Sequence, residues 1–455
     1  MKTLIIGAGI VGANIAVRLV EEGHDVTLID PDAGRLKEVT DQLDAGGLCG
    51  HGSHPRTLKL AGIESVDMVI AVTDSDEVNM MACMNASLLG QTEAIRVARV
   101  REPSYREAYE QEEDRGFIDL ILNPEQVTAE KVLALLRYPG VTEVLEFADG
   151  KVSLVGTHVK PDSPLAGLRL QELADRFPTW EFLVVAIERN GELIVPRGHD
   201  VILPGDEILL ALRSEEIEGV LEDVGIAISP ISRVMIVGGT PLARFLAQGL
   251  EARHIKPKLI ESDREVAADL AQHLPDTVVI HGSPTDGVLL LEENVGEMQA
   301  VITCSAREEV NLMAALLARR MGAGRIISTT NQTDYKPVMR AVGVDVCLSP
   351  RLSAVSAILR FVRQGHVVST QAIGSDEHAE ALEFEVDSDS PAVRKSLQSW
   401  RSPTGALVAA LVRDGLVLIP RGQTIIETGD RLLVVTRQDV VHDVEALLQH
   451  PAARG

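Results

Sequence analysis

The chain has 455 residues, of which 45% are hydrophobic and only 3% aromatic, and its formal net charge at pH 7 is −24. This length predicts about two to four domains. The scarcity of aromatic residues is typical of Val, Leu, Ile and Ala cores between helices and parallel strands. The acidic balance argues against nucleic acid as a partner, because phosphate neutralisation needs clustered Lys and Arg, and against direct adsorption to an anionic lipid surface.

The sequence also predicts a cytoplasmic location. No apolar run approaches the roughly 20 residues that a membrane-spanning helix needs. The first residues lead straight into a strand and a glycine loop, which is not the pattern of a signal peptide. The four cysteines are dispersed without a CxxC pair, as expected for reduced thiols in a protein core.

The first chemical motif is a glycine loop that follows a predicted strand over Thr3–Ile6 and opens a predicted helix over Ile10–Glu21. Its residues are Gly7, Ala8, Gly9, Ile10, Val11 and Gly12. In such a GxGxxG loop the first glycine permits a tight turn, the second lets a pyrophosphate approach, and the third lets the helix lie close to the strand. The pyrophosphate then meets the positive end of the helix. A structural glycine turn without a ligand is the alternative.

The second predicted strand ends in Asp30, at the position where a carboxylate can accept both hydroxyls of a ribose. An acidic side chain there repels a 2′-phosphate, so the sequence favours NAD over NADP. The loop after the third strand contains His51, Gly52 and Ser53, which we expect to contact the cofactor near its adenosine. The HxxH spacing of His51 and His54 also suits zinc, but no third ligand is evident, and we predict no metal site.

Polar residues follow the next two predicted strands. Thr73, Asp74 and Asn79 stand between a strand and a helix N-terminus, where they suit contact with a phosphate or ribose. Simple helix capping by Asp74 or Ser75 is the alternative. Arg99 and Arg101 end the following strand, and Arg99 is our candidate for pairing with a phosphate. Its alternative role is a salt bridge to a nearby acid, Glu102 or Glu107.

The chain is internally repeated, which is the main evidence for its domain organisation. Matching Gly7 to Gly238 gives an offset of 231 residues, and at that offset Asp30 corresponds to Glu261. The loop at His51–Pro55 has its counterpart at His281–Pro284 after a slip of one residue. Strands alternate with amphipathic helices in both copies, so each predicts a Rossmann-like, doubly wound parallel sheet.

A second, smaller module also occurs twice. Pro196-Arg197-Gly198 before Gly205-Asp206 matches Pro420-Arg421-Gly422 before Gly429-Asp430. Each copy predicts short strands joined by turns and followed by a helix. The sequence therefore predicts four domains in the order large, small, large, small, over residues 1–138, 139–229, 230–364 and 365–455.

The second glycine loop differs from the first. Thr240 replaces the glycine that would face a pyrophosphate, and its Cβ crowds the approach of a ligand. Pro241 removes a backbone donor from the same loop. Glu261 retains the ribose carboxylate, whereas Thr329 stands where the first copy has Arg99. We expect the second site to bind nucleotide poorly, with a structural role or an altered ligand as the alternatives.

These motifs resemble those of the TrkA family, the peripheral subunits of bacterial Trk potassium transporters. The resemblance rests on GAGIVG with Asp30, on GHGSHP at Gly50–Pro55, on TDSDEVNM at Thr73–Met80, on VARVR at Val97–Arg101, and on the duplicated plan. It implies two RCK units (regulator of conductance of potassium), each with a Rossmann N-subdomain and a small α+β C-subdomain. Thr240 and Pro241 depart from the family pattern.

The resemblance further implies what the protein does. It implies a non-catalytic regulatory subunit that binds NAD(H), or alternatively ATP or ADP, and gates a TrkH-like membrane subunit. It also implies a homo-oligomer, a tetramer in this family, held at the cytoplasmic face of the inner membrane by that partner. An NAD-dependent oxidoreductase is the second hypothesis and a structural scaffold the third. The small modules offer turn residues rather than a positioned proton donor, which disfavours the enzyme.

Overall fold

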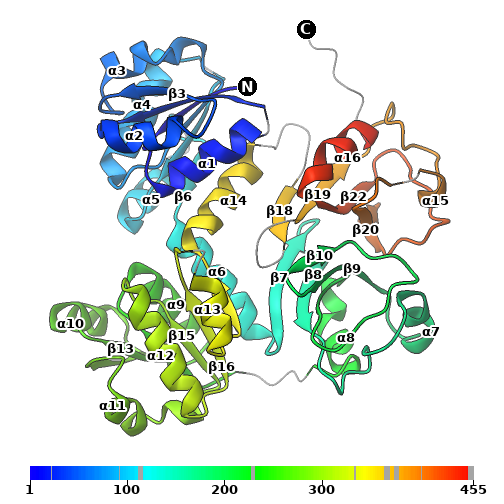
Figure 1. Ribbon diagram of the computed structural model, residues 1–455. Coiled ribbons are helices and arrows are strands. Elements are labelled where there is room, and N and C mark those ends of the chain that lie inside the picture. Colours follow the sequence, from blue (N-terminus) through cyan, green and yellow to red (C-terminus); the bar gives the residue numbers. More distant parts are fainter. Residues whose placement is uncertain are drawn as a thin grey trace.

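The computed structural model describes residues 1–21, 23–91, 93–110, 116–226, 231–332, 335–362, 369–373, 379–400 and 402–448. Two six-stranded parallel sheets alternate along the chain with two five-stranded antiparallel sheets. Figure 1 shows the two parallel-sheet units on one side of the molecule and the two antiparallel sheets on the other. The predicted fold, a duplicated Rossmann-like unit followed each time by a small α+β unit, is confirmed.

The first parallel sheet has the strand order β3-β2-β1-β4-β5-β6. Its strands are β1 (Lys2–Ile6), β2 (Asp25–Asp30), β3 (Gly46–Cys49), β4 (Met68–Ala71), β5 (Ile95–Arg99) and β6 (Leu120–Leu122). The connecting helices are α1 (Ile10–Glu21), α2 (Ala33–Thr40), α3 (Pro55–Leu60), α4 (Asp76–Leu89) and α5 (Pro103–Glu110). The order reverses between β1 and β4, and ligands of open α/β sheets bind beside such a switch point, at the carboxyl ends of the strands.

The second parallel sheet repeats this order as β14-β13-β12-β15-β16-β17. Its strands are β12 (Val234–Val237), β13 (Lys258–Glu261), β14 (Val278–His281), β15 (Ala300–Thr303), β16 (Arg325–Thr329) and β17 (Val346–Leu348). Its helices are α9 (Pro241–Glu251), α10 (Arg264–His273), α11 (Gly287–Glu292), α12 (Glu308–Arg320) and α13 (Tyr335–Ala341). The central strands are continuous apolar runs because helices cover both faces of each sheet.

Each parallel-sheet unit leads into an antiparallel sheet through a long helix, α6 (Pro124–Arg137) or α14 (Pro350–Val362). The first antiparallel sheet contains β7 (Val141–Phe147), β8 (Val152–His158), β9 (Phe182–Arg189), β10 (Glu192–Ile194) and β11 (Glu207–Arg213), with helices α7 (Leu173–Arg176) and α8 (Ile217–Asp223). The second contains β18 (Ser369–Ile373), β19 (Ala379–Glu385), β20 (Ala406–Arg413), β21 (Leu416–Leu418) and β22 (Arg431–Arg437), with α15 (Leu397–Trp400) and α16 (Val441–Leu448). The expected boundary after residue 138 falls between α6 and β7, whereas those after 229 and 364 lie outside the described residues.

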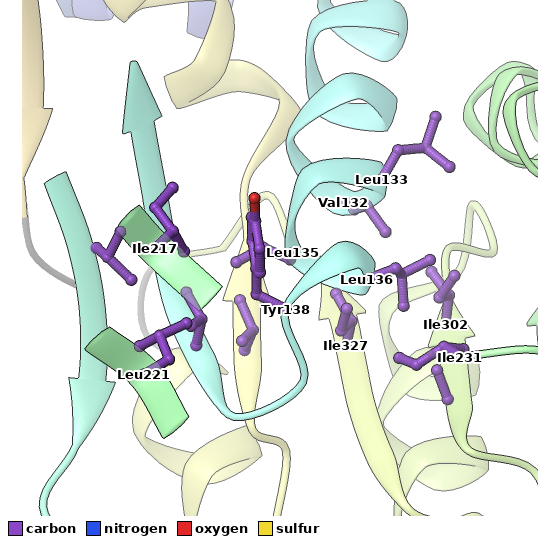
Figure 2. Close-up of a cluster of buried hydrophobic side chains, with 14 of the residues drawn as sticks. Val132, Leu133, Leu135, Leu136, Tyr138, Ile217, Leu221, Ile231, Ile302 and Ile327 are labelled. Atoms are coloured by element: carbon purple, nitrogen blue, oxygen red, sulfur yellow. The ribbon is translucent and has the colours of Figure 1, made fainter. Parts of the chain in front are cut away.

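The two connecting helices are exchanged between the halves of the chain. Helix α6, which leaves the first unit, buries Val132 and Leu136 in one apolar cluster with Leu246 of α9 in the second unit. Helix α14, which leaves the second unit, buries Val355 and Ile358 in one cluster with α1 of the first unit. Figure 2 shows the cluster around the end of α6, with α8 on one side and the second parallel sheet on the other. This exchange fixes the two Rossmann-like units relative to each other.

The antiparallel sheets pack against each other through small side chains. One apolar cluster joins Ala186 and Ala211 of the first sheet with Ala381 and Ala410 of the second. At its edge the buried carboxylate of Glu383 on β19 pairs with Arg431 at 2.5 Å. Burial raises the pKa of Glu383, and the positive charge of Arg431 opposes that rise.

The repeated Gly-Asp turns proved to be more than turns. Asp206, 2% exposed, accepts hydrogen bonds from the guanidinium of Arg189 at 2.7 Å. Asp430, 1% exposed, does the same for Arg413 at 2.8 Å. In both sheets the ion pair ties the turn before the last strand to an earlier strand. The sequence predicted the turn in each module but not this buried pair.

Candidate functional site

The carboxyl ends of both parallel sheets line one cavity of about 990 Å³. Most of the predicted contact residues line it: Gly7, Ala8, Gly9, Ile10, Val11, Asp30, His51, Gly52, Thr73, Asp74 and Arg99. Gly12, Ser53, Asn79 and Glu261 are outside its lining. Residues of the second unit form the facing wall, among them Thr240, Ser305 and Asn331. The cavity therefore belongs to both halves of the chain.

The three glycines of the first loop differ in what surrounds them. Gly7 has a φ of +107°, a backbone conformation that residues with a side chain rarely adopt. A Cβ there would lie 3.2 Å from the backbone nitrogen of Thr73. A Cβ on Gly12 would lie 1.9 Å from the carbonyl oxygen of Gly7, so this glycine permits the close approach of α1 to β1. Gly9 has no atom within 4 Å of its ideal Cβ position. Its backbone faces open space, as the approach of a ligand requires.

Asp30 holds the glycine loop in place. Its side chain, 4% exposed, accepts a hydrogen bond from the Ala8 nitrogen at 2.8 Å and one from the Asp32 nitrogen at 2.9 Å. Each carboxylate oxygen has a further lone pair, so both can still accept a ribose hydroxyl. The structure thus gives Asp30 a structural contact that the sequence did not predict, and its contact with a ribose stays a prediction.

The loop after β3 lies close against β1. A Cβ on Gly52 would lie 2.1 Å from Cγ2 of the buried Ile6, so only glycine fits there without a shift. The His51 ring stacks on that of His54 with centroids 4.8 Å apart, and its Nδ1 lies 3.0 Å from the Ser53 hydroxyl. Within the described ranges, no group of three or more His, Cys, Asp or Glu side chains could hold a metal ion.

Asn79 links two strand ends by hydrogen bonds. Its side-chain oxygen accepts hydrogen bonds from the Thr73 nitrogen at 2.8 Å and from the Thr73 hydroxyl at 2.7 Å. Its amide nitrogen donates to the carbonyl oxygen of Arg99 at 2.8 Å. Fully buried, Asn79 links the ends of β4 and β5 rather than facing the cavity. Ser75 caps α4 by accepting a hydrogen bond from the Val78 nitrogen, so the capping interpretation holds for that residue.

Arg99 lies in the cavity wall with its side chain 13% exposed. It pairs with Asp74 at 3.6 Å and Glu125 at 3.8 Å, and not with Glu102, one of the two acids suggested as its alternative partners. The Glu107 side chain lies outside the described residues. Both ion pairs are longer than the 2.7–2.9 Å typical of charged hydrogen bonds. Within the described structure the Arg99 Nε atom is buried without a hydrogen-bond partner, as is Oε2 of Glu125.

The second glycine loop keeps the same backbone with different chemistry. Gly238 has a φ of +104°, and Glu261 accepts hydrogen bonds from the Gly239 nitrogen and from the Asp263 nitrogen, as Asp30 does in the first copy. Thr240 caps α9, and its hydroxyl donates to the carbonyl oxygen of Cys304 at 2.8 Å. A Cβ on Gly239 would contact the side chain of Glu261 at 2.9 Å. The second loop thus carries the Thr240 side chain at the position where the first has the open Gly9.

Sequence reasoning missed the residues that reach the cavity from the starts of the connecting helices. Glu125 stands in the first turn of α6 and Arg351 in the first turn of α14, and both line the cavity. Glu308 of α12 also lines it and accepts a hydrogen bond from the Asn331 nitrogen at 2.8 Å. Each connecting helix begins with a proline that stands two residues after the end of the last strand of its parallel sheet. That repeated position was the available signal.

Comparison with protein families agrees with the duplicated plan. The TrkA-N domain model matches residues 3–124 and 234–350, and the TrkA-C domain model matches residues 155–225 and 381–449. The Trk system potassium uptake protein TrkA of Vibrio alginolyticus is 36% identical over 454 residues, covering 99% of both chains. That of Halomonas elongata is also 36% identical, with the same coverage.

Solved structures share the fold at low sequence identity. The RCK domain of GsuK superposes with a TM-score of 0.64 at 17% identity, covering 98% of this chain and 95% of that one. The GsuK channel bound to NAD gives a TM-score of 0.63 over 98% of this chain and 78% of the other. Among the helices that the structure describes, none has the length and apolar character to cross a membrane.

Proposed function

Because this chain belongs to the TrkA family of Trk system potassium uptake proteins, we propose that it is a nucleotide-sensing regulatory subunit of a Trk-type transporter. The relatives that support this are alike over 99% of the chain, so all four units have counterparts in them. We expect the partner to be a TrkH-like membrane subunit and the complex to lie at the cytoplasmic face of the inner membrane.

The observation that carries the proposal is the open first glycine loop beside Asp30. There a pyrophosphate can meet the N-terminus of α1 while a ribose reaches the carboxylate. The solved GsuK structures include one bound to NAD and one bound to ADP. We therefore propose NAD(H), or ATP or ADP, as the ligand of the first site. The second loop, occupied by Thr240 and Glu261, is proposed to bind nucleotide more weakly.

The shared cavity suggests how binding changes shape. A ligand shifts an equilibrium between two shapes only if it binds them unequally. A nucleotide on the first unit faces a wall made by the second, so its affinity depends on how the two units are placed. The exchanged helices α6 and α14 lead from the cavity to the antiparallel sheets, and we propose that they transmit this change.

The test is potassium flux through the cognate transporter in liposomes, with and without this protein and each nucleotide. We expect flux to depend on nucleotide and on this protein together. Flux that is indifferent to every nucleotide would end the gating hypothesis. Substrate-dependent consumption of NADH by the purified protein would replace it with the oxidoreductase hypothesis.

Assembly is a separate part of the proposal. A ring beneath a transporter needs contacts between chains, and family resemblance points to a homotetramer. Light scattering at micromolar concentration, with and without nucleotide, should return the mass of an oligomer. A monomer under both conditions would contradict this part.

A further inference from the structure

The wall of the cavity carries two arginines from different halves of the chain. Arg99 ends β5 in the first Rossmann-like unit, and Arg351 lies in the first turn of α14, which leaves the second unit. We propose that Arg351 joins Arg99 in binding the terminal phosphates of a nucleoside di- or triphosphate held on the first glycine loop. This inference rests on the proposed nucleotide site, and it assigns to the second half a part in recognising the ligand.

The exchanged helix places Arg351 at the phosphate end of the site. Helix α14 packs on α1, with Ala354 and Val355 in one apolar cluster with Val11 of the first turn of α1. Ile10 and Val11 at the start of α1 and Arg351 at the start of α14 line the same cavity. A pyrophosphate on the glycine loop lies at the start of α1. The phosphates beyond it therefore extend into the space that Arg351 borders.

The hydrogen bonding of Arg351 is weak, so its guanidinium can still bind a ligand. Its Nη1 donates to the carbonyl oxygen of Asn331 at 3.3 Å, at the long end of hydrogen-bond distances. Partial burial lowers the pKa of Arg351, the carboxylate of Glu308 opposes this, and the positive charge of Arg99 lowers the pKa further. The two arginines are thus near enough to repel each other across the boundary between the halves. An anion between them relieves that repulsion.

The ion-pair partners of Arg99 leave its guanidinium able to bind a phosphate. Its two ion pairs, to Asp74 and Glu125, are long, and its buried Nε atom donates to no acceptor in the described residues. Asp74 has a side chain 92% exposed, so water already satisfies much of its charge. A phosphate can accept two hydrogen bonds from one guanidinium group. The carboxylate of Asp74, 3.6 Å from Arg99, does not do so here.

This arrangement distinguishes ligands by the number of their phosphates. A ligand that ends at the α-phosphate lies on the first unit and its glycine loop alone. One with a β- or γ-phosphate also contacts the helix that leaves the second unit, and so it favours the shape in which the two units are close. A dinucleotide has no terminal phosphate, because its second phosphate is esterified to the nicotinamide ribose, and so it gains less from Arg351 than ADP or ATP does.

The test is calorimetry of the full chain and of its Arg351→Gln variant against AMP, ADP and ATP. We expect the substitution to weaken ATP binding by about 10- to 100-fold, the usual effect of losing a hydrogen bond between charged groups, and to leave AMP binding unchanged. Arg351→Lys should fall between, because it keeps the charge and loses the fork. Arg320→Gln, an exposed change at the end of α12 outside the cavity lining, is the charge-matched control and should bind all three like wild type.

The outcomes separate this inference from the proposed function. If wild type binds none of these nucleotides and no NADH, the proposed function fails and the inference with it. If wild type binds ATP and Arg351→Gln binds it equally well, only the inference is overturned. An equal loss of AMP and ATP affinity would also overturn it, since that pattern shows a structural role for Arg351. Unchanged AMP binding serves at the same time as the check that the variant is folded.

Discussion

Arg325 at the start of β16 fixes the end of the exchanged helix α6. Its side chain is buried, and Nη1 donates to the carbonyl oxygens of Leu135 at 2.6 Å and Tyr138 at 3.3 Å. Nη2 donates to the carbonyl oxygen of Val141, the first residue of β7. The carbonyls at a helix C-terminus have no partners within the helix, so the guanidinium supplies what α6 lacks. The second Rossmann-like unit thereby holds the junction between the first unit and its antiparallel sheet.

The size of the effect follows from two opposing contributions. Hydrogen bonds from a charged donor contribute about 1.5–3 kcal/mol each, so three of them give roughly 5–9 kcal/mol. Burial opposes this by lowering the pKa of Arg325 to about 10, which corresponds to about 3 kcal/mol against the charged form. Arg325→Met removes both contributions. We expect the free energy of unfolding to fall by about 2–6 kcal/mol.

Hydrogen exchange followed by mass spectrometry is the assay, because it locates the loss along the chain. Amide protection should fall across 135–141 in Arg325→Met. Arg319→Met is the matched control, since Arg319 donates to the carbonyl oxygens of Gly324 and Gly343 within the second unit. That control should lose protection in the second unit and keep it across 135–141. Unchanged protection of that segment in Arg325→Met would refute the reasoning.

Three further predictions concern single sites. Asp30→Ala should weaken nucleotide binding by about 10- to 100-fold in calorimetry, because the ribose loses a charged acceptor; unchanged affinity for every nucleotide would remove the assignment. Gly52→Ala should destabilise the fold by about 1–3 kcal/mol in denaturant unfolding, since its Cβ would lie 2.1 Å from a buried isoleucine methyl, whereas Gly9→Ala should unfold like wild type. Arg431→Met leaves the buried Glu383 carboxylate without its cation and should cost about 3–5 kcal/mol; adding Glu383→Leu should recover most of the loss, and no recovery would contradict the pairing.

Local patterns in the sequence predicted most of the first Rossmann-like unit. The helix expected over Ile10–Glu21 has those bounds in the structure, and the strand expected over Thr3–Ile6 begins one residue earlier. These elements follow from apolar periodicity and glycine spacing, which act over a few residues. The repeat at an offset of 231 residues predicted the second unit by the same reasoning. The predicted family is confirmed as well.

The sequence also determined which residues stand at the ends of the strands. Of the predicted contacts, those at the carboxyl ends of β1, β2 and β4 line the cavity because parallel strands end at one edge of a sheet. Gly12, which permits the close approach of α1 to β1, and Asn79 were exceptions in that group. The Asn79 side chain turns inward and joins two strand ends. It does so because backbone groups after β4 and at the end of β5 need hydrogen-bond partners, which its place in the motif does not reveal.

Only the tertiary structure decided which residues face one another across the cavity. Arg99 meets Glu125 instead of its sequence neighbour Glu102, and Arg351, from the other half of the chain, lines the same cavity as the first glycine loop. Both depend on the exchange of α6 and α14, which is set by burying an apolar helix face against the opposite unit. An apolar stripe shows that a helix must be covered, but it does not specify by which partner. That partner is selected when the whole chain packs.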